Sequence, residues 1–244
     1  MEHEAADAAS KLRSEGIEAE SLALDVTKAA DRAVAAKLVE ARYGKLDILV
    51  NNAGVGPADG LIGLRASEST ELQSIFNINL FSLVASTHEL LPLLRKSEAD
   101  RIVNLVSILG SLTLQSMEQS PIAPIRKFAY NASKAAVNVF TIYLAAELRD
   151  TNIKVNSVYP GSVKTALGSD AAPMSVPDGA KTTVAVALLG SDSPNGRFVS
   201  STKSIKNCTG KDIPLYAAED IGGRRQCSSP TSPIPGSLVH IADK

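Results

Sequence analysis

The sequence predicts an α/β protein, a doubly wound parallel sheet in a single Rossmann-like domain. Four short apolar segments are typical of strands, at 22–26, 46–50, 102–106 and 153–159. The second and third are almost continuously apolar, as parallel strands buried on both faces require. Stretches with helical spacing separate the four segments, and this strand and helix alternation favours a parallel sheet covered by helices on both faces.

Three helices are predicted between these strands. The first covers about 29–43, with Thr27 as a candidate N-cap and Gly44 at its end. The second runs from about 67 to 96, where leucines recur at helical spacing and Pro92 marks its end or a kink. The third covers about 131–149.

Composition excludes several classes of function. The 25 Lys and Arg residues against 26 Asp and Glu give a net charge of -1, without the basic excess that nucleic-acid binding demands. Two cysteines and three histidines lack the spacing of metal ligands, so no metal site is expected. The acidic first residues and the absence of a long apolar run predict a cytoplasmic protein without a membrane partner.

The character of the chain changes after about residue 200. Residues 201–244 hold 8 Gly and Pro and 9 Ser and Thr with no clear period. We therefore expect one domain over 1–200 and an irregular or disordered tail over 201–244.

Candidate functional residues follow the predicted strands, where open parallel sheets bind their ligands. The second strand leads into Asn51-Asn52-Ala53-Gly54, the third into Ser107-Ile108-Leu109-Gly110 and the fourth into Pro160-Gly161-Ser162-Val163-Lys164-Thr165. Small residues let a ligand approach the backbone closely, and Asn and Ser offer compact hydrogen-bonding groups. Ordinary turn chemistry would account for any one of these loops alone.

Tyr130 and Lys134 form a pair that is a more specific indication of catalysis. Four residues apart on a helix, they share one face, and an ammonium group beside a phenol lowers the pKa of that phenol. Tyr130 is therefore a candidate general acid, and Ser107 could hold the substrate oxygen if it points into the same cleft.

The order Asn-Asn-Ala-Gly, Ser-x-x-Gly, Tyr-x-x-x-Lys and Pro-Gly-x-Val-x-Thr resembles the short-chain dehydrogenase/reductase family over about residues 5–200. The resemblance implies reversible hydride transfer with Ser107, Tyr130 and Lys134 as a catalytic triad, completed by Asn79. It also implies a nicotinamide cofactor, NADP or NAD, with NADP favoured by the similarity to carbonyl reductases. The cofactor-binding residues it implies are Asp25, Val26, Asn52, Ala53, Gly54, Tyr130, Lys134, Pro160, Gly161, Val163 and Thr165.

The family normally begins with a strand, a glycine-rich turn for the pyrophosphate and a second strand. Residues 5–15 instead resemble the helix that follows that second strand, so the predicted sheet is incomplete at its N-terminal side. Gly54-x-Gly56-x-x-x-Gly60 is a poor substitute because Pro57 interrupts it.

Three hypotheses about function follow. The first is an NAD(P)-dependent oxidoreductase acting on a small carbonyl or alcohol, with Tyr130 as general acid and base. The alternative is a non-catalytic fragment or remnant that acts as a binding or interaction module, and a cofactor-binding sensor is a third possibility. The segment between Ser107 and Tyr130 contains Pro121 and Pro124 and is longer than the usual spacing in the family that the sequence resembles. The resemblance to carbonyl reductases with such an enlarged segment implies a monomer or weak dimer rather than a tetramer.

Overall fold

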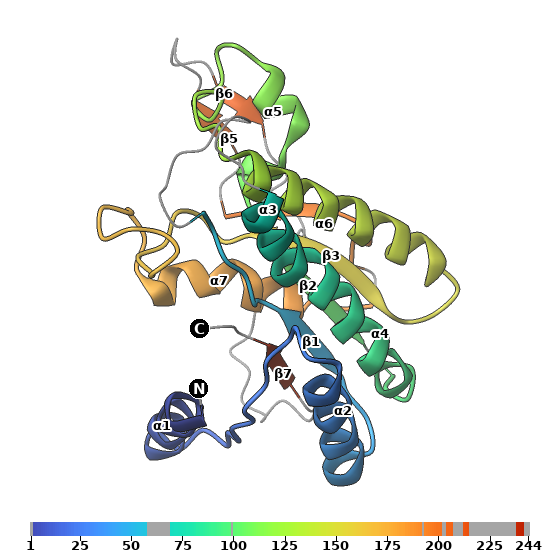
Figure 1. The fold of residues 1–244 in the computed structure, drawn as a ribbon. Coiled ribbons are helices and arrows are strands. Elements are labelled where there is room, and N and C mark those ends of the chain that lie inside the picture. The colour runs from blue at the N-terminus through green and yellow to red at the C-terminus, as the bar shows by residue number, and fades with distance from the viewer. Residues whose placement is uncertain are drawn as a thin grey trace.

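The computed structural model describes residues 2–57, 69–98, 100–191, 193–201, 204–206, 212–214 and 238–241. Its centre is a five-stranded parallel sheet in the order β4-β3-β2-β1-β7 (Figure 1). The strands are β1 (Ile48–Asn51), β2 (Arg101–Leu105), β3 (Lys154–Tyr159), β4 (Phe198–Ser200) and β7 (Leu238–Ile241). Three of the four predicted strands are thus present.

Helices cover both faces of this sheet. Helices α2 (Ala29–Tyr43), α4 (Leu83–Leu94) and α6 (Phe128–Glu147) pack on one face, and α7 (Val176–Ala187) lies on the other (Figure 1). Neighbouring strand residues point to opposite faces, so Leu49 packs with α2, α4 and α6, whereas Val50 packs with α7. The predicted doubly wound α/β class is confirmed.

The segment predicted as one helix over 67–96 has three parts. Described residues begin with α3 (Ser69–Phe76), continue through a π-helical turn, η1 (Asn77–Ser82), and end with α4. The chain stays helical for two residues beyond Pro92. A π-helical turn is rare and often occurs at functional sites, and here it contains Asn79.

The prediction of a strand over 22–26 is wrong. These residues form no strand in the structure, and Val26 packs into the core instead. A strand needs a neighbour to accept its backbone hydrogen bonds, and none of the described strands lies beside this segment.

Thr27 is not an N-cap either. Its amide and its hydroxyl both donate to the Asp25 carboxylate, at 3.0 and 2.6 Å, so the cap position falls to Lys28 without a side-chain bond. The predicted end of this helix is confirmed, since Gly44 takes the left-handed conformation with a φ of 72°.

The remaining elements lie before the sheet, beside its carboxyl edge and in the tail. Helix α1 (Glu2–Ser14) opens the described chain, and the enlarged segment contains a 3-10 turn, η2 (Ile108–Gly110), and α5 (Leu112–Ser116). Within the tail, β5 (Ser204–Lys206) and β6 (Asp212–Pro214) form an antiparallel pair, and β7 joins the main sheet. Among the described helices, none has the length and apolar character needed to cross a membrane.

Candidate active site

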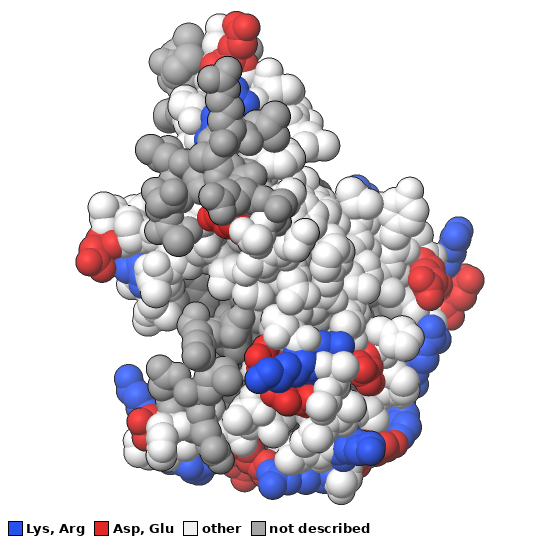
Figure 2. Space-filling model, viewed as in Figure 1, with Lys and Arg blue, Asp and Glu red and all other residues white. Residues whose placement is uncertain are grey.

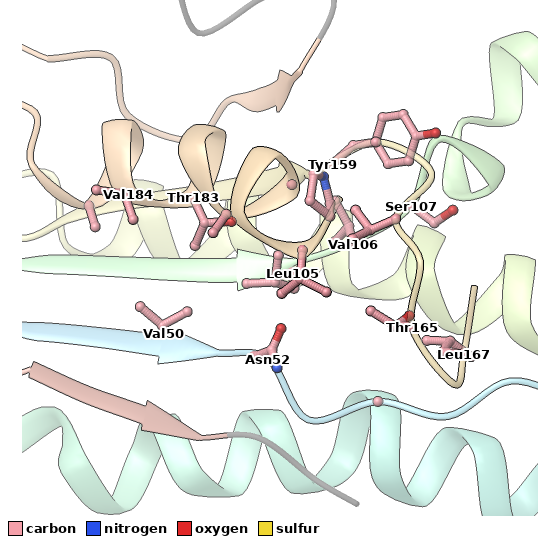
Figure 3. A pocket seen from close by; sticks show the side chains of 18 of the residues that line it. Val50, Asn52, Leu105, Val106, Ser107, Tyr159, Thr165, Leu167, Thr183 and Val184 are labelled. Carbon is pink, nitrogen blue, oxygen red and sulfur yellow. The ribbon is translucent and has the colours of Figure 1, made fainter. Parts of the chain in front are cut away.

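A cavity of about 1620 Å³ opens along the sheet face that α7 covers and extends past the carboxyl ends of the strands. Figure 3 shows its two ends: Val184 and Thr183 of α7 at one, and Ser107, Tyr159, Thr165 and Leu167 at the other. Predicted site residues from four separate segments line it. They are Asn52, Gly54, Ser107, Tyr130, Lys134, Pro160, Gly161, Val163 and Thr165.

Ser107 lies between the end of β2 and the start of η2. Its side chain is 8% exposed, and its hydroxyl accepts a hydrogen bond from the Leu109 amide at 3.2 Å. This bond caps the short turn and fixes the rotamer, while the hydroxyl hydrogen remains available for donation into the cavity.

Tyr130 and Lys134 lie in the first two turns of α6, which begins three residues earlier than predicted. The Lys134 Nζ lies 5.8 Å from the centre of the Tyr130 ring and donates to the Leu105 carbonyl at 3.0 Å. Lys134 is buried, so this bond compensates for part of the hydration that its ammonium group has lost.

Burial dominates the electrostatics of this pair. It lowers the pKa of Lys134 to about 8, because removal from water disfavours the charged amine. Burial also raises the pKa of Tyr130, whereas a side-chain hydrogen bond with Ser107 lowers it by a smaller amount. The net shift is therefore opposite to the lowering that was expected from Lys134, because burial of the phenol dominates. The phenol is protonated at neutral pH, which is the form that can donate a proton.

Asn79 does not line the cavity, although it lies directly behind it. Its side chain is fully buried and clamps the backbone of Val55, accepting from the amide at 2.8 Å and donating to the carbonyl at 2.9 Å. It also donates to the Ser133 hydroxyl at 3.0 Å, between Tyr130 and Lys134 on α6. Asn79 thus joins the loop after β1 to the helix that holds the proton-transfer pair.

Gly54 brings this loop close to both groups. A Cβ atom added there would lie 3.2 Å from the Lys134 Nζ and 3.3 Å from the Asn79 Oδ1, closer than most real contacts of a Cβ. A residue without a side chain therefore keeps the floor of the cavity open beside the lysine.

Three other predicted cofactor residues lie outside the lining. Val26 is 2% exposed and packs in the core, while Ala53 borders a separate void of about 10 Å³. The Asp25 carboxylate is occupied by Thr27 and by an ion pair with Lys28 at 3.2 Å. These bonds and this charge lower the pKa of Asp25. Gly60 lies outside the described residues.

The sequence reasoning missed the apolar wall beside Ser107. Leu109, Ile122, Ile125 and Leu167 line this end of the cavity, and Tyr159 points its phenol into the same region as the Ser107 hydroxyl (Figure 3). Three of these residues, Leu109, Ile122 and Ile125, come from the enlarged segment. The isoleucines that follow its two prolines were the available signal. Over the described residues, no cluster of His, Cys, Asp and Glu could hold a metal ion.

The chain is similar to a known family of enzymes and to individual members of it. A family model described as short chain dehydrogenase matches residues 1–175. Short-chain dehydrogenase/reductase 1 of Saponaria officinalis is 31% identical over 245 residues, covering 79% of this chain and 80% of the relative. Cyclopentanol dehydrogenase of Comamonas sp. is 34% identical over 183 residues, covering 75% and 67%.

A solved structure shares the fold. NADPH-bound carbonyl reductase from chicken fatty liver matches with a TM-score of 0.70 and 22% identity, over 86% of this chain and 82% of that chain. The doubly wound sheet, the motifs in their order along it and the family match over residues 1–175 lead to one conclusion. The chain belongs to the short-chain dehydrogenase/reductase family of oxidoreductases.

Proposed function

We propose that this chain is an NAD(P)-dependent oxidoreductase that transfers a hydride between a nicotinamide cofactor and a small carbonyl or alcohol substrate. One observation carries the proposal: Ser107, Tyr130 and Lys134 all line a single cavity. The name of the Comamonas relative, an alcohol dehydrogenase for cyclopentanol, agrees with a small alcohol as substrate.

The residues of the cavity fit the nicotinamide end of such a cofactor. Gly54 leaves the backbone open beside the Lys134 ammonium, a donor suited to ribose hydroxyls. Asn52, Pro160, Gly161, Val163 and Thr165 would hold the rest of this end. Bound there, the cofactor would supply the hydride. NADP is our choice over NAD, supported by the NADPH-bound carbonyl reductase of similar fold. Asp25, Val26 and Ala53 are proposed for the adenine side and middle on family resemblance alone.

The protein's own residues handle the proton. In the reduction direction, Tyr130 donates its phenolic proton to the substrate carbonyl oxygen, and the Ser107 hydroxyl donates a hydrogen bond to the same oxygen. The Lys134 ammonium then stabilises the phenolate that remains, 5.8 Å from the ring centre. Asn79 is a positioning residue that keeps the loop and α6 in register.

Tyr130→Phe tests the proposal. The substitution removes only the hydroxyl, so carbonyl reduction should fall by roughly 10² to 10⁴-fold while NADPH binding, followed by fluorescence titration, stays within about threefold. Phe128→Leu, at a partly exposed position outside the cavity lining of the same helix, is the control and should retain activity. Unchanged turnover in Tyr130→Phe would contradict the assigned role.

A non-catalytic remnant is the second candidate. It is favoured by the segment 22–26, which forms no strand in the structure. A chain that folds by circular dichroism but binds neither NADPH nor NADH would support this candidate. A cytoplasmic location stays a prediction from the sequence.

A further inference from the structure

The outer edge of β1 is covered by a segment from the far end of the chain. Strand β7 runs parallel to β1 with Ile48, Leu49, Val50 and Asn51 opposite Leu238, Val239, His240 and Ile241. Figure 1 shows β7, in dark red, beside the blue β1 although almost 190 residues separate them in the sequence.

Strand β1 needs a neighbour on this side. Leu49, Val50 and Asn51 are all less than 5% exposed, so this is a buried strand. Backbone groups of a strand alternate between its two neighbours, and β2 satisfies only one set of them. Unpaired amide and carbonyl groups beside a buried strand are costly and open to wrong pairing. Within the described chain, β7 is what pairs with the other set.

The position of β7 in the sheet has a particular meaning. In dinucleotide-binding sheets, the order 3-2-1-4-5-6 sets the first strand beside the fourth, and the ligand binds in the crevice where the order reverses. In this chain the sheet grows from β1 through β2 and β3 to β4 in one direction, and β7 lies on the opposite side of β1. The reversal therefore falls between β7 and β1.

This reversal point adjoins the candidate site. Val50, Asn52 and Gly54, from β1 and the loop after it, line the large cavity. Because parallel strands end at the same edge of a sheet, the carboxyl end of β7 lies next to the start of this loop, where Asn51 is paired with Ile241.

We propose that residues 238–241 act as the second partner strand of β1, which extends the sheet beyond β1 and forms, with β1, the crevice that receives the cofactor. The proposal has two halves. The cofactor half, that the crevice between β7 and β1 receives the cofactor, rests on the proposed function. The pairing half, that β7 pairs with β1, does not depend on it.

Hydrogen exchange followed by mass spectrometry tests the pairing in the unmodified chain first. Peptides over 48–51 and 238–241 should both be protected. In Val239→Pro/His240→Pro, two successive backbone donors are lost, so exchange over 48–51 should become at least about tenfold faster, while 101–105 and 154–159 change little. The control, Val239→Thr/His240→Thr, keeps both amides and should match the unmodified chain.

The possible results separate the two halves. Fast exchange over 238–241 in the unmodified chain, or equal protection of 48–51 in all three proteins, would overturn the pairing. Failure of the proline variant to fold, when the threonine variant folds, supports a required strand.

Titration with NADPH then tests the crevice. At least tenfold weaker binding to the proline variant supports it, whereas equal binding with a deprotected β1 overturns the cofactor half. Intact pairing with no NADPH binding to the unmodified chain contradicts the proposed function and leaves β7 as a purely structural strand.

Discussion

At the scale of single residues, Gly54 is a position where one added methyl group would meet two polar side chains of the candidate site. An alanine there would have its Cβ 3.2 Å from the Lys134 Nζ and 3.3 Å from the Asn79 Oδ1, so one of the two must move. We expect Gly54→Ala to weaken NADPH binding by about tenfold or more, measured by fluorescence titration. Gly190→Ala is the matched control, because an added Cβ at that glycine meets nothing within 4 Å. Equal affinity in both variants would contradict a close approach at Gly54.

Lys134 should leave a signature in the pH dependence of stability. Its pKa of about 8 in the folded chain lies below the ordinary 10.5, so between these values the unfolded state binds more protons. The free energy of unfolding should therefore rise with pH across this window, by up to about 3 kcal/mol for this group. Urea denaturation from pH 7.5 to 9.5 should show this slope in the unmodified chain and less of it in Lys134→Met.

The control for this slope is Lys164→Met, at an exposed position. It should keep the pH dependence of the unmodified chain. Identical slopes in all three proteins would mean that the Lys134 amine is not desolvated as the structure has it.

At the scale of elements, buried amides tie the sheet to its helices. Asn51 of β1 donates to Asn104 of β2 at 2.9 Å and to Thr87 of α4 at 3.0 Å. Asn104 in turn donates to Thr141 of α6 at 3.0 Å. The four side chains are all under 5% exposed, so water cannot reach them and these bonds satisfy their polar groups instead.

Asn104→Ala would leave the Asn51 amide and the Thr141 hydroxyl each short of a partner. We expect the free energy of unfolding to fall by about 2 kcal/mol or more, from lost hydrogen bonds and lost packing together. Asn152→Ala, at an exposed position after α6, should stay within about 0.5 kcal/mol. A loss at Asn104 no larger than at Asn152 would show that these bonds add nothing to stability.

Prediction from sequence succeeded where structure is local. The bounds of α2 follow from apolar spacing and Gly44, and β1, β2 and β3 lie within two residues of their predicted ranges. Prediction failed where the structure of a segment depends on whether another strand lies beside it. The segment 22–26 has strand-forming residues but no neighbouring strand among the described ones, whereas Leu238–Ile241 forms β7 at the edge of β1.

The candidate site divides in the same way. Nine of the residues that the motifs singled out line the cavity, from Asn52 to Thr165. The motifs did not indicate that Asn79 clamps Val55, that Val26 is core or that burial raises the pKa of Tyr130. Those properties depend on three-dimensional surroundings that one sequence does not contain.

At the scale of the whole molecule, charge is unevenly distributed. Figure 2 shows few charged side chains over α6 and α3, and a mixture of both signs around α2. Apolar residues of α6 and η1 are exposed: Val139 is 53%, Ile142 55% and Tyr143 73% accessible on α6, and Phe81 is 58% accessible on η1. Scattered exposed apolar residues are ordinary, but several on neighbouring helices favour weak self-association.

We therefore expect a monomer in equilibrium with a weak dimer, as the enlarged segment predicts. Size-exclusion chromatography with light scattering should show a mass that rises with concentration, and Tyr143→Glu should hold it at the monomer value. Val34→Glu, at an exposed position of α2, is the control and should leave the equilibrium unchanged. A stable tetramer would contradict this expectation.

The two faces of the sheet are filled unequally. The face toward α2, α4 and α6 holds the larger core cluster, whereas the opposite face has α7 and a cavity of about 1620 Å³. A ligand that occupies this space binds the folded chain alone, and at a hundred times its Kd it would add about 2.7 kcal/mol to stability. The steady-state amount of this protein in a cell would then follow the supply of its ligand, with degradation removing copies that stay empty.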